Sequence, residues 1–138
     1  MLGKDDALKR FEKFRSDQGD PPTWTIEDDG QVARLGVQDV ADPSRRCVIT
    51  SPGVDWLIVE TDTGFTYGVF GEEMDDDDVF RNLHLFVDIS DAYFRGDCEV
   101  VTVGRLLRRS VLKVNLPSGV LSMQRTLVDD VRRMLSRD

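Results

Sequence analysis

The chain has 138 residues, of which 40% are hydrophobic and 32% charged, and this composition is typical of one folded domain with its own core. Its net charge of −8 and isoelectric point near 4.6 exclude broad affinity for nucleic acid or an anionic membrane, because both need Lys and Arg side chains against phosphate groups. The charge is divided by position: residues 1–94 carry nine Lys/Arg and twenty-one Asp/Glu, whereas residues 95–138 carry nine and five. We therefore expect a protein that presents a charged surface to a partner.

The N-terminal segment predicts a short amphipathic helix. Apolar side chains recur about one turn apart between residues 6 and 15, and the run Gly19-Asp20-Pro21-Pro22 ends the helix because proline cannot continue it. The first residues lack the basic flank and apolar run of a secretion signal, and no segment approaches the roughly 20 apolar residues of a membrane span. We therefore expect a cytoplasmic protein in which Cys47 and Cys98 are free thiols.

Strand signals dominate the next part of the chain. Asp28-Asp29-Gly30 is a tight hairpin signature between two predicted strands, and Asp62-Thr63-Gly64 joins two more. Such short connections favour antiparallel pairing. Gly68 lies within the predicted strand of residues 65–70, and a glycine in that position predicts a β-bulge. The predicted strands are residues 24–27, 32–37, 47–50, 54–61 and 65–70.

A long helix is predicted behind four consecutive aspartates, residues 75–78. Apolar residues recur at three- and four-residue intervals as far as Phe94, and Gly96 ends the pattern. The helix, residues 76–95, is rich enough in Phe, Leu and Val to lie across one face of the sheet. It is expected to bury Phe80, Leu83, Val87 and Phe94 there.

The C-terminal part returns to strands, predicted at residues 99–103, 105–114 and 120–124, and Thr126 can cap a final short helix. The predicted fold is thus a single α+β domain over residues 1–138. It has a mostly antiparallel sheet, a long helix packed on one face, and the order α-β(5)-α-β(2–3)-α.

The aspartates Asp75, Asp76, Asp77 and Asp78 are the first candidate site. Clustered carboxylates can bind Ca²⁺ or Mg²⁺, but the spaced D-x-D-x-D-G pattern of a calcium loop is missing here. Aspartates at a helix start are explained by the positive end of the helix dipole. We expect no metal site, and an acidic ridge suited to a basic partner.

Catalytic motifs are not recognisable in the chain. His84 is the sole histidine, and Asp88, four residues on, offers it an ordinary helix-surface contact rather than a catalytic pair. There is no G-x-S-x-G elbow, and the glycines at 64, 68 and 71 are not spaced for phosphate binding. We expect no catalytic residue, no metal and no cofactor. A small enzyme or ligand-binding domain without a recognisable motif is the third alternative for function.

The basic run of Arg105, Arg108, Arg109 and Lys113 is expected to pair with the protein's own acidic half. Nucleic-acid binding is disfavoured, since the aromatic residues that stack on bases are missing from this region. Aromatic residues of the strands are first of all core or cross-strand pairs, and one left on the solvent face would anchor a partner. The predicted partner-binding residues are Asp55, Asp62, Asp75, Asp76, Asp77, Asp78, Trp56 and Tyr67.

The run Val54-Asp55-Trp56-Leu57-Ile58-Val59-Glu60-Thr61-Asp62-Thr63-Gly64-Phe65, followed by the aspartates and the helix, resembles the small acidic immunity proteins of bacterial polymorphic-toxin systems. The resemblance covers residues 46–95. It implies a non-enzymatic, monomeric, cytoplasmic protein that neutralises a cognate basic toxin domain.

The element order also resembles that of type III secretion chaperones, although this chain has extra strands before residue 54. This second resemblance implies a dimer that binds an unfolded effector segment. Neither family supplies catalytic residues to this chain.

Overall fold

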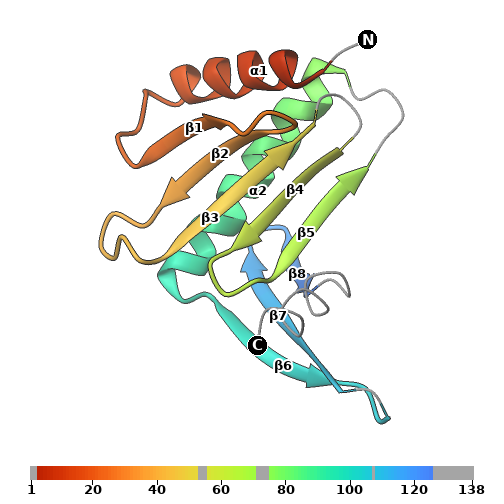
Figure 1. The fold of residues 1–138 in the computed structure, drawn as a ribbon. Coiled ribbons are helices and arrows are strands. Elements are labelled where there is room, and N and C mark those ends of the chain that lie inside the picture. The colour runs from red at the N-terminus through yellow and green to blue at the C-terminus, as the bar shows by residue number, and fades with distance from the viewer. Residues whose placement is uncertain (1–2, 53–55, 71–74, 107, 126–138) are drawn as a thin grey trace, which may run out of the picture.

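The computed structural model of the protein describes residues 3–52, 56–70, 75–106 and 108–125. In these residues an antiparallel sheet of eight strands packs against two helices (Figure 1), which confirms the α+β class and the antiparallel pairing. The strands lie in the order β1-β2-β3-β4-β5-β8-β7-β6. The final helix predicted from Thr126 lies outside the described residues.

The first helix, α1 (Lys4–Asp17), forms where apolar residues recur at helical spacing. Asp5 and Asp6 lie in its first turn, where the helix dipole favours negative charge. The chain leaves the helix through Gly19, whose φ of 85° is a left-handed conformation that glycine adopts without strain. The buried side chains of α1, which face β1 and β2, are Ala7, Phe11 and Phe14.

Five strands follow as consecutive antiparallel hairpins. Their register stacks apolar residues on one face: Leu35 lies opposite Ile49, which lies opposite Val59, and all three are fully buried. Gly68 lies opposite Ile58 in an unbroken register, so the predicted bulge at Gly68 is wrong. The strands are β1 (Trp24–Asp28), β2 (Ala33–Gln38), β3 (Arg46–Ser51), β4 (Trp56–Thr61) and β5 (Thr66–Phe70).

The second helix, α2 (Asp76–Arg95), crosses β3, β4 and β7. The residues that α2 buries differ from the predicted set. Leu83 is buried as expected, but Phe80, Val87 and Phe94 are half-buried. The physical reason is that α1 shares the same side of the sheet, so Phe80 packs at the junction, with its ring 6.4 Å from that of Phe14. The apolar side chains that α2 buries are Val79, Leu83, Phe86, Ile89, Ala92 and Tyr93.

The last three strands complete the sheet, and β8 joins it to β5 by the pairing of Thr66 with Gln124. The strand predicted over residues 105–114 begins only at Arg109, because Gly104, with φ of 97°, leads the chain out of β6 into a loop. These strands are β6 (Cys98–Val103), β7 (Arg109–Leu116) and β8 (Gly119–Gln124).

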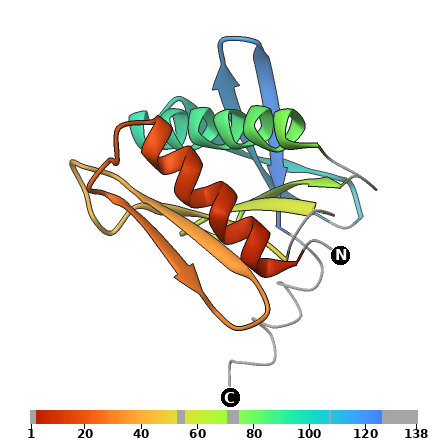
Figure 2. The same cartoon turned by 90° about the horizontal axis from the view of Figure 1, so that it is seen from above.

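The hydrophobic core lies between the two helices and one face of the sheet (Figure 2). Trp24 belongs to it, with its ring stacked 5.7 Å from that of Phe14, and Phe65 is fully buried, as expected for strand aromatics. Both helices cover the same face, so no described helix covers the opposite face of β1–β5, which we call the open face.

Candidate functional site

The open face of β1–β5 is built from the residues that alternate with the core. In β2, β3 and β4 the buried residues all point toward the helices, and the residues between them are half-buried or exposed. The strand pairings carry this alternation across all five strands, since residues directly opposite each other share a face. No side chain of β1–β5 on the open face is buried.

Three apolar side chains meet on this face at β4 and β5. Trp56 lies directly opposite Phe70, and Ile58 lies opposite Gly68. Trp56 and Ile58 are half-buried, whereas the side chain of Phe70 is 70% exposed. We call Trp56, Ile58 and Phe70 the apolar patch.

Gly68 makes room for the aromatic ring of Phe70. A Cβ atom on Gly68 would lie 3.1 Å from Cε2 of Phe70 and 3.2 Å from Cγ1 of Ile58. The ring of Phe70 therefore reaches back over the backbone of Gly68 toward Ile58. This close approach explains a glycine within a regular strand without a bulge.

Polar and charged residues lie next to the apolar patch, on the part of the open face nearer to β1–β3. A hollow of about 410 Å³ lies there, with Glu27, Arg34, Arg46 and Glu60 as its charged lining. Nη1 of Arg34 lies 2.6 Å from Oδ2 of Asp29. Protein–protein interfaces commonly have such an apolar centre and a polar, solvated rim.

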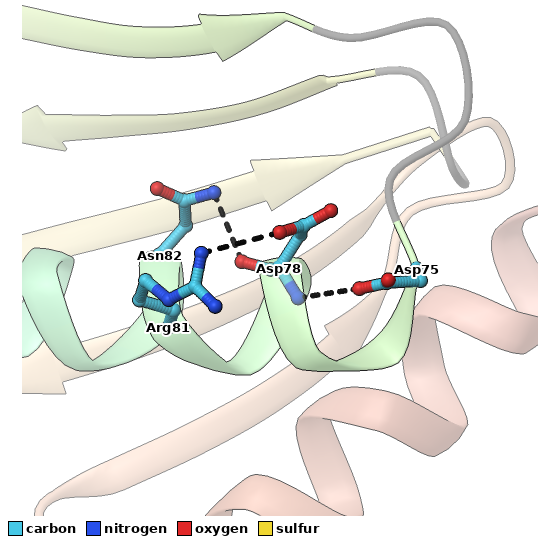
Figure 3. Close-up of polar contacts among 4 residues, drawn as sticks. All are labelled: Asp75, Asp78, Arg81 and Asn82. Atoms are coloured by element: carbon cyan, nitrogen blue, oxygen red, sulfur yellow. Dashed lines mark hydrogen bonds and ion pairs between the residues drawn. The ribbon is translucent and has the colours of Figure 1, made fainter.

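The aspartate run lies at the start of α2, which packs on the face of the sheet opposite to the apolar patch. Oδ1 of Asp75 accepts a hydrogen bond of 2.8 Å from the backbone N–H of Asp78, which makes Asp75 the N-cap (Figure 3). Oδ1 of Asp78 lies 3.3 Å from Nη1 of Arg81, and Nδ2 of Asn82 donates to the carbonyl of Asp78. These two aspartates therefore have local structural roles.

The other two aspartates of the run face α1. Oδ1 of Asp76 accepts from Nε of Arg10 at 2.9 Å and lies 2.8 Å from its Nη2. Asp77 is exposed, and within the described residues its carboxylate makes no hydrogen bond or ion pair. The hollow between α1 and α2 at this point also carries Lys9 and Lys13. The acidic ridge predicted from the sequence is thus partly neutralised by basic side chains of α1.

The remaining predicted partner-binding residues are dispersed. Asp62 accepts hydrogen bonds from the Tyr93 hydroxyl and the Arg46 backbone N–H, and Tyr93 lies near the C-terminal end of α2. Because α2 has 20 residues and spans about 30 Å, Asp62 and the aspartate run lie toward opposite ends of the helix. Tyr67 points into the core, with its ring centroid 6.2 Å from that of Phe86. Asp55 lies outside the described residues.

Trp56 is therefore the predicted aromatic residue that the structure places on the open face. The residue pattern places Ile58 on the same face as Trp56, but Ile58 was not among the predicted partner-binding residues, and Phe70 was missed as a neighbour. The signal was present, since Ile58 lies two residues after Trp56 in a strand and therefore on the same face. The pairing of Trp56 with Phe70 needed the hairpin register, which the residue pattern alone does not fix.

The sequence singled out three titratable groups, His84, Cys47 and Cys98, and the structure shows the surroundings of each. His84 is exposed, and its ring lies edge-on to that of Phe14, with centroids 5.0 Å apart. Burial raises the pKa of the Cys47 thiol to about 12, and Cys98 is half-buried; the two cysteines are not bonded to each other. Among the residues described, no three His, Cys, Asp or Glu side chains are grouped to share a metal ion.

The basic residues of the C-terminal part face solvent. Arg105 and Arg108 lie in the loop between β6 and β7, and both are exposed, as is Arg109 at the start of β7. Lys113 donates a hydrogen bond of 2.8 Å to Oγ of Ser122. Within the described part of the chain these four residues make no ion pair, so the expected pairing with the acidic half is not observed.

Comparison of the chain with models of protein families, with curated proteins and with solved structures found no match. Neither described helix has the length and apolar composition needed to cross a membrane. Function is therefore inferred from the surface residues themselves, among which the apolar patch is the most informative.

Proposed function

We propose that this protein is a non-enzymatic binding module that holds a protein partner on the open face of its sheet. The observation that carries the proposal is the apolar patch, in which Phe70 is 70% exposed beside the half-buried Trp56. Aromatic side chains at the centre of an interface contribute most of its affinity once the partner covers them. The charged rim around the patch supplies orientation and specificity.

The first candidate partner is a basic toxin domain, which makes this protein a cytoplasmic immunity protein. The segment of residues 24–70 carries eight acidic and three basic residues, a balance of −5, although the charged residues that line the open face itself are two acidic and two basic, Glu27, Glu60, Arg34 and Arg46. Opposed charge speeds the encounter of two proteins, and the effect weakens as salt rises. Asp77 would add to this attraction, since its carboxylate is exposed and makes no ion pair within the described residues.

A growth assay tests the immunity proposal. The protein encoded next to this one is expressed in a bacterial host, alone and together with this chain, and growth is measured. We expect the wild-type chain to restore growth, Phe70→Ala to restore less, and Val40→Ala to match the wild type. Val40 is a fair control because it is 82% exposed and lies in the loop between β2 and β3. Failure of the wild-type chain to restore growth would contradict the immunity proposal.

A second candidate, a chaperone-like protein for an unfolded effector segment, is favoured by the edge strand β6. This strand ends the sheet, and extended peptides bind such edges by adding a strand. The two candidates differ in the state of the partner that binds. Calorimetric titration with the neighbouring protein in its folded form, and with its N-terminal segment as a peptide, separates them: an immunity protein binds the former and a chaperone the latter.

A further inference from the structure

We propose that the protein partner adds a strand to the outer edge of β5, at Gly68 and Phe70, so that side chains of the added strand cover the apolar patch. This inference rests on the proposed function and specifies how the open face holds its partner. It concerns the part of β5 that follows Thr66, the residue at which β8 pairs with β5.

The sheet opens between β5 and β8. All six residues of β8 pair with β7, but only Gln124 of β8 pairs with β5, at Thr66. Beyond Thr66 the two strands diverge, and Figure 1 shows no described strand on the outer side of the remaining part of β5. Within the described part of the chain, this stretch of β5 is therefore an edge, although it belongs to a strand in the middle of the sheet order.

The backbone groups of this edge point away from β4. The N–H of Thr61 donates to the carbonyl of Phe65 at 2.9 Å, so these residues form a hydrogen-bonded pair of the β4–β5 hairpin. Antiparallel ladders alternate, so the second and fourth residues after Phe65 also turn their backbone groups toward β4. Gly68 and Phe70 alternate with those residues. Each of them therefore directs one N–H donor and one C=O acceptor outward.

The composition of β5 also suits an added strand. Thr66–Phe70 contains neither proline nor a charged residue, and all its residues except Gly68 are of types that favour strands. Proteins protect sheet edges with proline, charge or a covering helix. The edge strand β1 has such protection, since α1 packs against it and Asp28 forms a 2.8 Å ion pair with Lys4. No described helix covers the edge of β5 in this way.

The edge of β5 is continuous with the apolar patch. Phe70 belongs to both, because its backbone lies on the edge and its side chain, 70% exposed, lies on the open face. The ring of Phe70 reaches back over Gly68, where a Cβ atom would lie 3.1 Å from Cε2 of the ring. Residues directly opposite each other share a face, so added residues opposite Gly68 and Phe70 would place their side chains against this ring.

These features define the chemistry of the occupant. Alternating outward N–H and C=O groups are matched by an extended polypeptide backbone, whereas a helix uses its own backbone groups internally. Because the edge is uncharged and the neighbouring side chains are apolar, the added segment carries apolar side chains opposite Gly68 and Phe70. It has no proline at these two positions, since proline lacks the N–H that the pairing needs. An edge strand or an extended loop of a folded toxin domain has this chemistry.

A second copy of the chain does not fit as the occupant. Antiparallel pairing of two β5 strands centred on Gly68 would place Thr66 of each copy opposite Phe70 of the other. The outward side of Thr66 is already occupied, because its hydroxyl donates a 2.9 Å hydrogen bond to the carbonyl of Gln124. Strand β8 of each copy would therefore stand where the other copy must bind.

Amide hydrogen exchange, measured residue by residue by NMR, tests the proposal. In the free chain, the protection factors of Gly68 and Phe70 should be at least about tenfold lower than those of Tyr67 and Val69, whose amides bond to β4. Binding of the protein encoded beside this chain should raise the protection of Gly68 and Phe70 at least about tenfold. High protection of these two amides in the free chain, or unchanged protection in the complex, would overturn the proposal.

Val100 of β6 is the control for this measurement. The N–H of Asn115 donates to the carbonyl of Asp97, so by the same alternation Val100 directs its backbone groups away from β7. Its amide should stay unprotected in the complex. Protection that arises at Val100 in place of Gly68 and Phe70 would assign the partner to the β6 edge and overturn the proposal.

Two variants at Phe70 separate the backbone of this residue from its ring. Phe70→Ala removes the ring alone, whereas Phe70→Pro also removes the outward N–H, without breaking a hydrogen bond to β4. In calorimetric titration with the same protein, Phe70→Pro should bind at least about tenfold more weakly than Phe70→Ala, with both folds intact by circular dichroism. Equal weakening by the two variants would overturn strand addition and leave the open face as the binding site. Unchanged affinity of both variants would contradict the open face itself, and with it this inference.

Discussion

Asp75 and Asp77 belong to one run of like residues but stabilise the protein to different extents. The carboxylate of Asp75 accepts a 2.8 Å hydrogen bond from the backbone N–H of Asp78, whereas Asp77 is exposed. A side-chain cap satisfies a backbone donor that the helix leaves unpaired. The run is therefore first a helix start, and its charge toward a partner is a secondary property.

This difference predicts the effect of two matched substitutions. Asp75→Ala should lower the free energy of unfolding by about 1 kcal/mol, the usual cost of losing an N-cap. Asp77→Ala should lower it by less than half as much in moderate salt, because its helix-dipole contribution is screened. Urea unfolding followed by circular dichroism measures both. Equal losses for the two variants would show that Asp75 does not act as a cap.

At the scale of elements, the residue pattern predicted the hairpins well and the long-range contacts poorly. Turn signatures such as Asp28-Asp29-Gly30 report local backbone geometry, so β1 to β5 were predicted within a few residues of their observed bounds. The strand predicted over residues 105–114 was placed too early, because Arg105, Leu106 and Arg108 lie before β7, which begins at Arg109. The pairing of β5 with β8 joins residues 58 positions apart, which periodicity does not encode.

The loop before β3 supplies a contact that no sequence pattern predicted. The guanidinium of Arg45 donates hydrogen bonds to the backbone carbonyls of Tyr93 at 2.7 Å and Phe94 at 3.3 Å, and lies 4.6 Å from the centre of the Tyr93 ring. A cation at this end of α2 complements the helix dipole, and it adds hydrogen bonds to the last carbonyls of the helix, of which that of Tyr93 also accepts from the backbone N–H of Gly96. Arg45 thereby fixes the end of α2 against the sheet.

Removal of this contact should destabilise the whole protein. Arg45→Ala should lower the free energy of unfolding by about 1–3 kcal/mol, because it breaks hydrogen bonds from a charged donor. Arg46→Ala is the control, since Arg46 is exposed and no side-chain hydrogen bond of Arg46 is found in the described residues. Thermal unfolding of both variants tests this expectation. A loss from Arg46→Ala as large as that from Arg45→Ala would contradict it.

For the whole molecule, the candidate site was only partly predictable. The charge balance and Trp56 were visible in the sequence, but the grouping of Trp56, Ile58 and Phe70 depends on which face the helices cover and on the β4–β5 register.

The affinity of the purified chain for the protein encoded beside it tests most directly whether the open face binds the partner. Calorimetric titration should show binding that Phe70→Ala weakens at least about tenfold, because a central aromatic anchor is removed. Val40→Ala should bind as the wild type does, since Val40 is 82% exposed in the loop between β2 and β3. Unchanged affinity of Phe70→Ala, with its fold intact by circular dichroism, would contradict a binding role for the open face.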